Sequence, residues 1–152
     1  MSRTYFDEIP VGWKKNVGRW RLAEAESIAF AKKWDPQPFH VDPEAATASI
    51  YGGLTASSLQ LFAICTRLFF DLDVEVAVLA MLGKESVRFP QPALIGEELV
   101  YVTECVSARA SQTKTDRGVI RLHDTLSDSA GRIVLSQDVD LMVARQSPRD
   151  QT

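Results

Sequence analysis

Residues 45–66 form a long run without any charged residue, and the second half of this run overlaps an apolar segment at residues 54–72. Within 54–72 apolar residues occupy most of the circumference of a helix, and the first charge is Arg67. The uncharged run also contains small and polar residues, namely Gly52, Gly53, Ser57, Ser58 and Gln60. These residues make the run too broken and polar to span a membrane. A helix that is apolar nearly all round belongs in a protein interior, so we expect 54–72 to be a central helix that the rest of the chain covers.

Nearly everything after this helix has the composition and alternation of β-strands. Strands are expected at residues 75–82, 86–89, 98–109, 118–127 and 132–144, with turns at 83–84, 90–96, 111–117 and 128–131. One central helix followed by consecutive strands lacks the βαβ alternation that builds a parallel sheet. The order of elements therefore favours an α+β fold with a sheet wrapped around the helix.

The chain before the central helix is expected to form a strand and two helices. A short strand at 17–22 leads into a moderately amphipathic helix at 23–34. The tripeptide Asp42-Pro43-Glu44 then has the residues that favour a helix start, with Asp as N-cap and Pro at the first helical position. We expect that second helix to end near Ser49.

Size and composition predict one globular domain over residues 1–145, followed by a flexible tail at 146–152. The chain has 152 residues, of which 45% are hydrophobic and 24% are charged. Its net charge of −3 provides no overall basic surface, so nucleic acid is not expected as a partner. A few local basic residues could contact a phosphate, but for each of them a solvated strand face is the favoured interpretation: Lys14, Lys15, Arg19 and Arg21.

The two cysteines and the N-terminal residues bear on the cellular compartment. Cys65 and Cys105 both lie in apolar segments, which predicts two buried free thiols rather than a disulfide. The first residues run directly into acidic and turn residues, so no signal peptide is expected. Together with the absence of a convincing membrane span, these features favour a cytoplasmic protein.

Residues 35–40, with the sequence Asp-Pro-Gln-Pro-Phe-His, contain the strongest candidates for chemistry. Asp35 is expected at the C-terminal end of the helix at 23–34, where a carboxylate faces the negative end of the helix dipole. The two prolines prevent the helix from continuing and hold the chain extended, so the carboxylate and the His40 imidazole can approach one small volume. Such a pair can handle a proton or a water molecule. The alternative role for Asp35 is that of a local turn former.

This segment resembles the catalytic motif of the MaoC-like dehydratases, the hot-dog-fold family that contains the (R)-specific enoyl-CoA hydratases. In that motif an Asp, usually followed by Asn-Pro, precedes a His by five residues, as Asp35 precedes His40. The similarity extends over about residues 5–144. Gln37 replaces the commoner asparagine, and Gly52 stands where a His often precedes the family's glycine.

The resemblance implies a hot-dog fold, in which an antiparallel sheet wraps around a long central helix. It also implies reversible hydration of a trans-2-enoyl-CoA to the (R)-3-hydroxyacyl thioester, with Asp35 and His40 as catalytic residues that hold one water. Gly53 is the implied oxyanion-hole residue. At the expected start of the central helix its backbone N–H would meet the thioester oxygen where partial positive charge accumulates. Gly53 could instead simply permit a tight turn.

Further residues in the same region are candidates for substrate binding, namely Gln37, Gly52, Ser57 and Ser58. The two serines fall one turn into the expected helix, where packing toward the core is an equal alternative. His123 alternates with polar residues and is expected on a strand surface. With two histidines and no cysteine cluster, no metal site is expected, and no cofactor is implied beyond the acyl thioester itself.

Two other functions remain open at this point. Acyl-CoA thioesterases of the same fold usually carry a carboxylate on the central helix, and residues 54–66 contain none. A non-catalytic hot-dog domain that binds acyl groups is the second alternative, against which the presence of Asp35 and His40 argues. The resemblance further implies a homodimer or a higher homo-oligomer, because a strand as long as 98–109 would otherwise leave an exposed edge.

Overall fold

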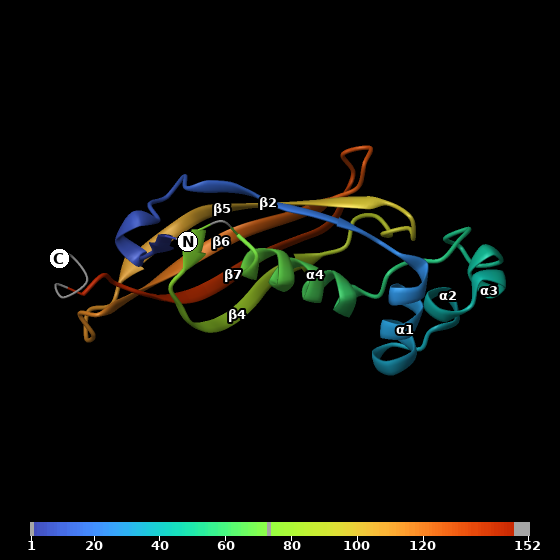
Figure 1. Ribbon diagram of the computed structural model, residues 1–152, viewed down its shortest axis with the longest axis horizontal. Helices are drawn as coiled ribbons and strands as arrows, with labels where there is room; N and C mark the ends of the chain where they lie inside the picture. Colours follow the sequence, from blue (N-terminus) through green and yellow to red (C-terminus); the bar gives the residue numbers. More distant parts are fainter. Residues whose placement is uncertain (1, 73, 148–152) are drawn as a thin grey trace.

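A five-stranded antiparallel sheet is the central feature of the part of the chain that the structure describes (Figure 1). The computed structural model describes residues 2–72 and 74–147. In order across the sheet, the strands are β2 (Lys14–Arg21), β5 (Glu98–Ala110), β6 (Arg117–Ser127), β7 (Ile133–Ala144) and β4 (Val78–Arg88). All four neighbouring pairs are antiparallel. The first and last strands in this order, β2 and β4, form the two edges of the sheet.

Among the described residues, four α-helices accompany the sheet: α1 (Glu24–Trp34), α2 (Pro38–Val41), α3 (Pro43–Thr47) and α4 (Ser58–Phe70). The first three gather beyond the N-terminal end of α4, at one end of the sheet (Figure 1). A short parallel pair of strands, β1 (Ser2–Thr4) and β3 (Val74–Val76), lies with the 3₁₀ turn η1 (Phe6–Glu8) toward the opposite end. None of the helices in the described ranges has the length and hydropathy that spanning a membrane requires.

The core lies between α4 and the face of the sheet on which it packs. Leu61, Ile64 and Leu68 of the helix are buried against strand residues such as Leu99 and Leu126. The helix is not covered on all sides, however, since Leu59 is 45% exposed and Phe70 is 78% exposed. We expected a helix that is buried on all sides. Within a single copy of the chain, only the face of α4 that packs on the sheet is buried.

The predicted strands at 98–109, 118–127 and 132–144 are confirmed to within one residue at each end. The prediction of two strands at 75–82 and 86–89 with a turn at 83–84 is wrong. A short strand, β3, ends at Val76, and β4 then runs without a turn through Gly83 and Lys84. Its pairing with β7 shifts register between Met81 and Gly83. A glycine at such an irregularity in a strand resembles a turn signal in the sequence.

Other local predictions are confirmed. Asp42 caps α3, because its carboxylate accepts hydrogen bonds from the backbone N–H groups of Glu44 (3.0 Å) and Ala45 (3.4 Å). Cys65 and Cys105 are both buried free thiols. The expected flexible tail lies mostly outside the described residues, which end at Ser147.

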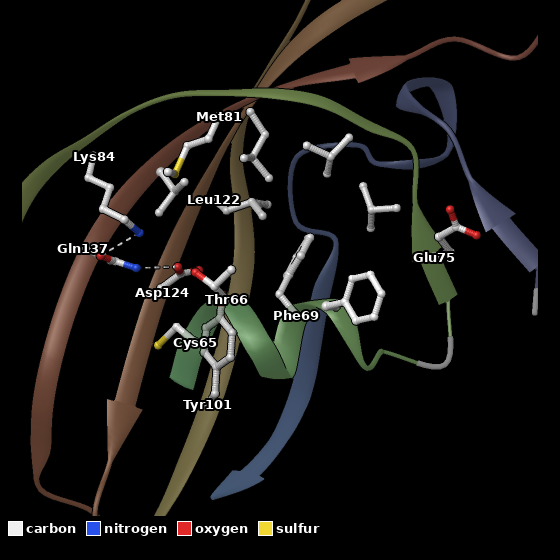
Figure 2. Close-up of a pocket in the computed structure, with 15 residues that line it drawn as sticks. Cys65, Thr66, Phe69, Glu75, Met81, Lys84, Tyr101, Leu122, Asp124 and Gln137 are labelled. Carbon is white, nitrogen blue, oxygen red and sulfur yellow. Dashed lines mark hydrogen bonds between the residues drawn. The ribbon is translucent and has the colours of Figure 1, made fainter. Parts of the chain in front are cut away.

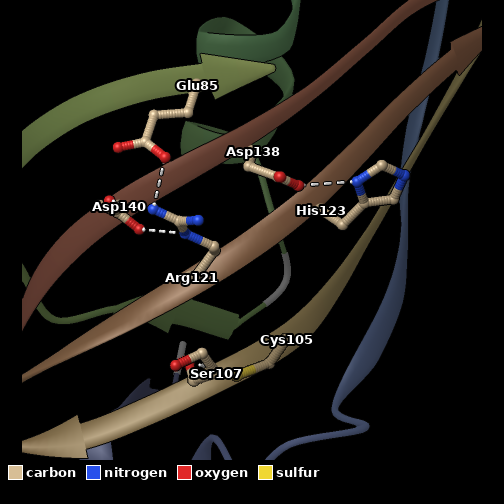
Figure 3. A network of polar contacts seen from close by, with 7 residues as sticks. All are labelled: Glu85, Cys105, Ser107, Arg121, His123, Asp138 and Asp140. Carbon is tan, nitrogen blue, oxygen red and sulfur yellow. Dashed lines mark hydrogen bonds and ion pairs between the residues drawn. The ribbon is translucent and has the colours of Figure 1, made fainter. Parts of the chain in front are cut away.

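The face of the sheet turned away from α4 carries cross-strand ion pairs (Figure 3). The Arg121 guanidinium donates to both carboxylate oxygens of Asp140 (2.8 and 2.9 Å) and to Glu85 (2.9 Å). Hydrogen bonding from Arg121 holds the pKa of the Asp140 carboxyl below its usual range. His123 pairs with Asp138 through Nδ1 at 2.8 Å, which confirms its predicted place on the polar face.

Close packing at Gly118 generates a stability prediction. A Cβ atom at this position would lie 2.4–2.6 Å from ring carbons of Phe6. Gly118→Ala should therefore force Phe6 out of its place and lower the free energy of unfolding by about 1–3 kcal/mol, the usual cost of overpacking. Gly83→Ala is the control, because its Cβ would meet open space. Urea titration of the variants measures the effect, and equal stability of Gly118→Ala and the parent would contradict it.

Candidate active site

Asp35 ends α1, as the sequence predicts. Its backbone N–H donates to the Ala31 carbonyl at 2.8 Å, and the residue itself leaves the helical conformation. The prediction that the chain stays extended through Pro38 is wrong, because Pro38 opens the short helix α2. Proline is tolerated at the first position of a helix, where its missing N–H costs nothing. As a result, the extended stretch ends at Gln37, and His40 lies in the single helical turn that follows it.

The structure brings the predicted pair together. His40 Nε2 lies 3.4 Å from Asp35 Oδ2, the histidine is buried, and the aspartate is partly exposed. Phe39 packs against the imidazole edge to face, with ring centroids 4.6 Å apart, and so restricts its rotation. A buried imidazole and a carboxylate at this separation can share one proton, or both accept a hydrogen bond from one water molecule that lies beside them.

The other nitrogen of His40 determines which tautomer is present. Nδ1 lies 2.7 Å from the backbone carbonyl oxygen of Thr55 and 3.2 Å from its hydroxyl oxygen. A carbonyl oxygen can only accept a hydrogen bond, so Nδ1 carries the hydrogen. In the neutral imidazole, Nε2 therefore presents a lone pair on the side of Asp35.

Thr55 belongs to an extended segment, residues 54–57, which we call the strap. Three backbone hydrogen bonds hold it: Thr55 N–H to Phe39 O (3.1 Å), Ala56 N–H to Ala93 O (2.8 Å) and Ile95 N–H to Leu54 O (2.9 Å). The expected helix at 54–72 therefore begins later, at Ser58, because the backbone of the strap is hydrogen-bonded to distant segments instead of to itself. The strap carries the Thr55 carbonyl to His40.

Ser57 ends the strap and caps α4. Its hydroxyl oxygen accepts the Leu59 N–H (3.2 Å), and its hydroxyl group donates to Asp35 Oδ2 (2.7 Å). The sequence placed this serine one turn inside the helix, as a candidate for substrate binding or core packing. The structure instead joins it to the candidate catalytic carboxylate.

A cavity of about 410 Å³ opens beside His40. Its walls are largely apolar and include Phe39, Tyr51, Leu61, Phe89, Ala93 and Val134. Ser58 lines this cavity, whereas Ser57 and Asp35 are not among the described residues that do so. An apolar cavity with one imidazole in its wall suits an apolar ligand whose polar end lies at His40.

Gln37, Gly52 and Gly53 are not among the described residues that line the cavity beside His40. Gly53 is five residues before Ser58, so its N–H is not at the N-terminus of α4 as expected. Gly52 has a φ of +69° in the turn that follows Ser49, a conformation that favours glycine. Gln37 is exposed, and its carbonyl accepts the His40 N–H at 2.9 Å. The roles of these three residues in binding stay predictions.

A second, larger recess of about 600 Å³ lies between α4 and β4 (Figure 2). We call it the α4–β4 recess, and its lining includes Phe69, Phe70, Val78, Met81, Lys84 and Leu141. At one side Lys84 Nζ donates to Gln137 (3.3 Å), whose amide donates in turn to Asp124 (2.9 Å). It shares no lining residue with the cavity beside His40.

Sequence reasoning missed the buried polar groups of this recess. Burial raises the pKa of the Asp124 carboxyl, which also accepts a hydrogen bond from Thr103 at 2.7 Å. Burial likewise raises the pKa of the Cys65 thiol to about 12, so the thiol is unreactive near neutral pH. A signal was present, because Asp124 falls in phase with the inward-facing Leu122 and Leu126. Within the described ranges, no three His, Cys, Asp or Glu side chains cluster as metal ligands would.

Comparison with known proteins identifies a family. Residues 8–125 match the family model described as the MaoC like domain. Protein MaoC of Klebsiella aerogenes is 33% identical over 104 residues, which make up 68% of this chain and 31% of that protein. The chain therefore spans less than a third of the length of this relative.

Solved structures agree on the fold. The MaoC-like dehydratase from Rhodospirillum rubrum matches with a TM-score of 0.87 and 29% identity, over 95% of this chain and 99% of that one. The (R)-hydratase PhaJ1 from Pseudomonas aeruginosa, without ligand, matches with a TM-score of 0.77 and 20% identity, over 93% and 86% of the two chains. The predicted α+β hot-dog fold, a five-stranded antiparallel sheet with a central helix, is confirmed.

The hydrogen bond from His40 to the strap predicts a tautomer. At a pH where its imidazole is neutral, His40 should carry its hydrogen on Nδ1, which long-range ¹H–¹⁵N correlation spectra of the labelled protein would report. Only one other histidine, His123, is present, so a His123→Gln variant assigns the signals. A neutral His40 with its hydrogen on Nε2 would contradict the arrangement.

Proposed function

Because this chain belongs to the MaoC-like dehydratase family, we propose that it catalyses the reversible hydration of a trans-2-enoyl-CoA to the (R)-3-hydroxyacyl thioester. The observation that carries the proposal is the 3.4 Å pair of Asp35 and His40, of which His40 lines a largely apolar cavity. The activity named for the P. aeruginosa (R)-hydratase, which shares the fold, is extended here to this chain. CoA as the carrier and the (R) configuration of the product are part of the proposal.

The proposed reaction begins with a water molecule that lies beside the two side chains. The lone pair on His40 Nε2 and the Asp35 carboxylate both accept hydrogen bonds, so one water can donate a hydrogen to each. The pair takes one proton as the water oxygen bonds to the β-carbon of the conjugated thioester. The pair then returns a proton to the α-carbon, so that one water is added and both side chains end in their starting state.

During this addition negative charge gathers on the thioester oxygen. We assign the backbone N–H of Gly53 to that oxygen by similarity to the family motif. Tyr51, two residues earlier, lines the cavity beside His40, which brings this part of the chain to the cavity margin. One donor of this kind typically lowers the barrier by about 3–4 kcal/mol.

Activity on crotonyl-CoA tests the proposal. The purified protein should remove the absorbance of the conjugated enoyl thioester, and Asp35→Asn and His40→Ala should each slow this at least about a hundredfold, the usual contribution of a general acid–base group. His123→Ala is the matched control, since that histidine lies on the far face of the sheet. Circular dichroism should show that all three variants are folded.

The same assay separates the alternatives. Release of free CoA thiol without hydration would indicate a thioesterase, and neither reaction would indicate an acyl-binding domain. The sequence of α4, from Ser58 to Phe70, contains no carboxylate, which does not favour a thioesterase. Near-normal turnover by either dyad variant would overturn the mechanism.

We also propose that the chain assembles into a homodimer or a higher homo-oligomer. The edge strands of the sheet are β2 and β4, and not the strand at 98–109 as the sequence argument assumed, since β5 lies between β2 and β6. Leu79, Met81 and Leu82 on β4 are each at least half exposed. A long apolar edge of this kind invites pairing with another strand.

The α4–β4 recess supports the same proposal. It lies beside the β4 edge and is lined by apolar residues of that strand and of the uncovered flank of α4 (Figure 2). Phe70 and Leu59 extend the apolar surface along the helix. A second copy that pairs through β4 would cover the recess and bury α4 on the sides that one chain leaves open.

The proposed assembly predicts a measurable mass. Light scattering at micromolar concentration should give about 34 kDa or more, since one chain has a mass of 16.9 kDa. Met81→Lys, at a residue that is 57% exposed on the β4 edge, should shift the mass toward the monomer. Val106→Lys is the control, because that exposed residue belongs to an interior strand. A parent protein of about 17 kDa would contradict assembly.

A further inference from the structure

Ser57 is joined to the candidate catalytic pair without reaching the cavity. The residue is 1% exposed, and the adjacent Ser58, not Ser57, lines the cavity beside His40. A substrate in that cavity therefore has no access to the Ser57 hydroxyl. The 2.7 Å hydrogen bond from this hydroxyl to Asp35 Oδ2 calls for a different role from the substrate binding expected from the sequence.

The Ser57 hydroxyl has one hydrogen and can donate one hydrogen bond. Its oxygen accepts the Leu59 N–H at 3.2 Å, as the N-cap of a helix does. With the oxygen held in this way, the hydrogen points to Asp35, whose carboxylate can only accept. The position of the carboxylate is thereby tied to the start of α4, which is itself packed on the sheet.

The surroundings of the Asp35 carboxylate indicate that the hydrogen bond from Ser57 stabilises it. At the C-terminal end of α1 the carboxylate faces the negative end of a helix dipole, which disfavours it. The contact with the N-cap residue places the same carboxylate at the N-terminus of α4, a helix of 13 residues, where the dipole is favourable. The hydrogen bond also falls on Oδ2, the oxygen that lies 3.4 Å from His40 Nε2.

From this geometry we propose that Ser57 is a positioning residue for the hydration reaction. Its hydroxyl selects the rotamer of Asp35 that faces His40 and keeps the two acceptors close enough for one water molecule to donate to both. The proposal rests on the proposed hydratase function. It assigns to Ser57 no contact with substrate and no proton transfer.

Three variants test the role. Ser57→Ala removes the donor and should lower kcat roughly ten- to a hundredfold with little change in KM, because a displaced catalytic group weakens the chemical step more than binding. Ser57→Gly also lacks the donor but is tolerated at an N-cap, so it keeps the test available if the alanine variant does not fold. Ser57→Thr keeps both hydrogen bonds and should restore most of the activity.

A matched control comes from the sheet. The Thr103 hydroxyl donates to Asp124 at the same distance, 2.7 Å, and is equally buried. Thr103→Val should lower the melting temperature without the selective loss of kcat. If Thr103→Val and Ser57→Ala reduce kcat alike, the effect is one of stability, and the positioning role is wrong.

Coupling to Asp35 gives the sharpest readout. In an Asp35→Asn background Ser57→Ala should cost little further activity, because both changes act through one carboxylate. Independent, multiplicative losses would overturn the proposal.

A crystal structure of Ser57→Ala separates this inference from the proposed function. The Asp35 carboxylate should leave its position 3.4 Å from His40 or occupy several rotamers, whether or not the parent protein hydrates crotonyl-CoA. An unmoved carboxylate overturns the positioning role even if the parent is a hydratase. A displaced carboxylate in a protein that proves inactive would support the positioning of Asp35 and reject hydration alone.

Discussion

The start of α4 is the point on which the candidate site depends. Packing of the helix on the sheet fixes where its first turn lies, and the strap at 54–57 must then pass His40 to reach it. The N-cap, Ser57, binds Asp35, while Thr55 in the same strap binds His40. Helix packing, helix capping and the geometry of the pair are therefore one connected arrangement. A change that moved α4 on the sheet would disturb both members of the pair at once.

The parts of the fold that the sequence predicts well are those in which local pattern and tertiary environment agree. Alternation along β6 separates Ile120 and Leu122, which face the core, from Arg121 and His123, which face outward. The predictions fail where distant partners decide. Gly83 pairs with Asp140 of β7 instead of forming a turn, and the strap is hydrogen-bonded to segments far from it in sequence.

The same distinction applies to the site. Asp35 and His40 are predictable as a pair because they lie five positions apart in a segment that resembles the MaoC-like motif. Their supports come from 15 and 22 residues away, in the Thr55 carbonyl and the Ser57 hydroxyl. A backbone carbonyl leaves no trace in the sequence, and a serine before an apolar helix is normally sufficiently explained as a cap. The connection of that cap to a carboxylate depends on the meeting of α1 and α4, which only the fold shows.

The two supports differ in how they respond to mutation. The hydrogen bond that sets the His40 tautomer is made by a main-chain oxygen, which every amino acid at position 55 would supply as long as the strap keeps its path. Tautomer control is thus protected against substitution and is inherited with the fold. The orientation of Asp35, in contrast, relies on one side-chain hydroxyl that a single base change could remove. In the divergence of proteins with this arrangement, loss or retuning of activity should therefore begin more readily at the residue that supports the carboxylate than at the one that supports the imidazole.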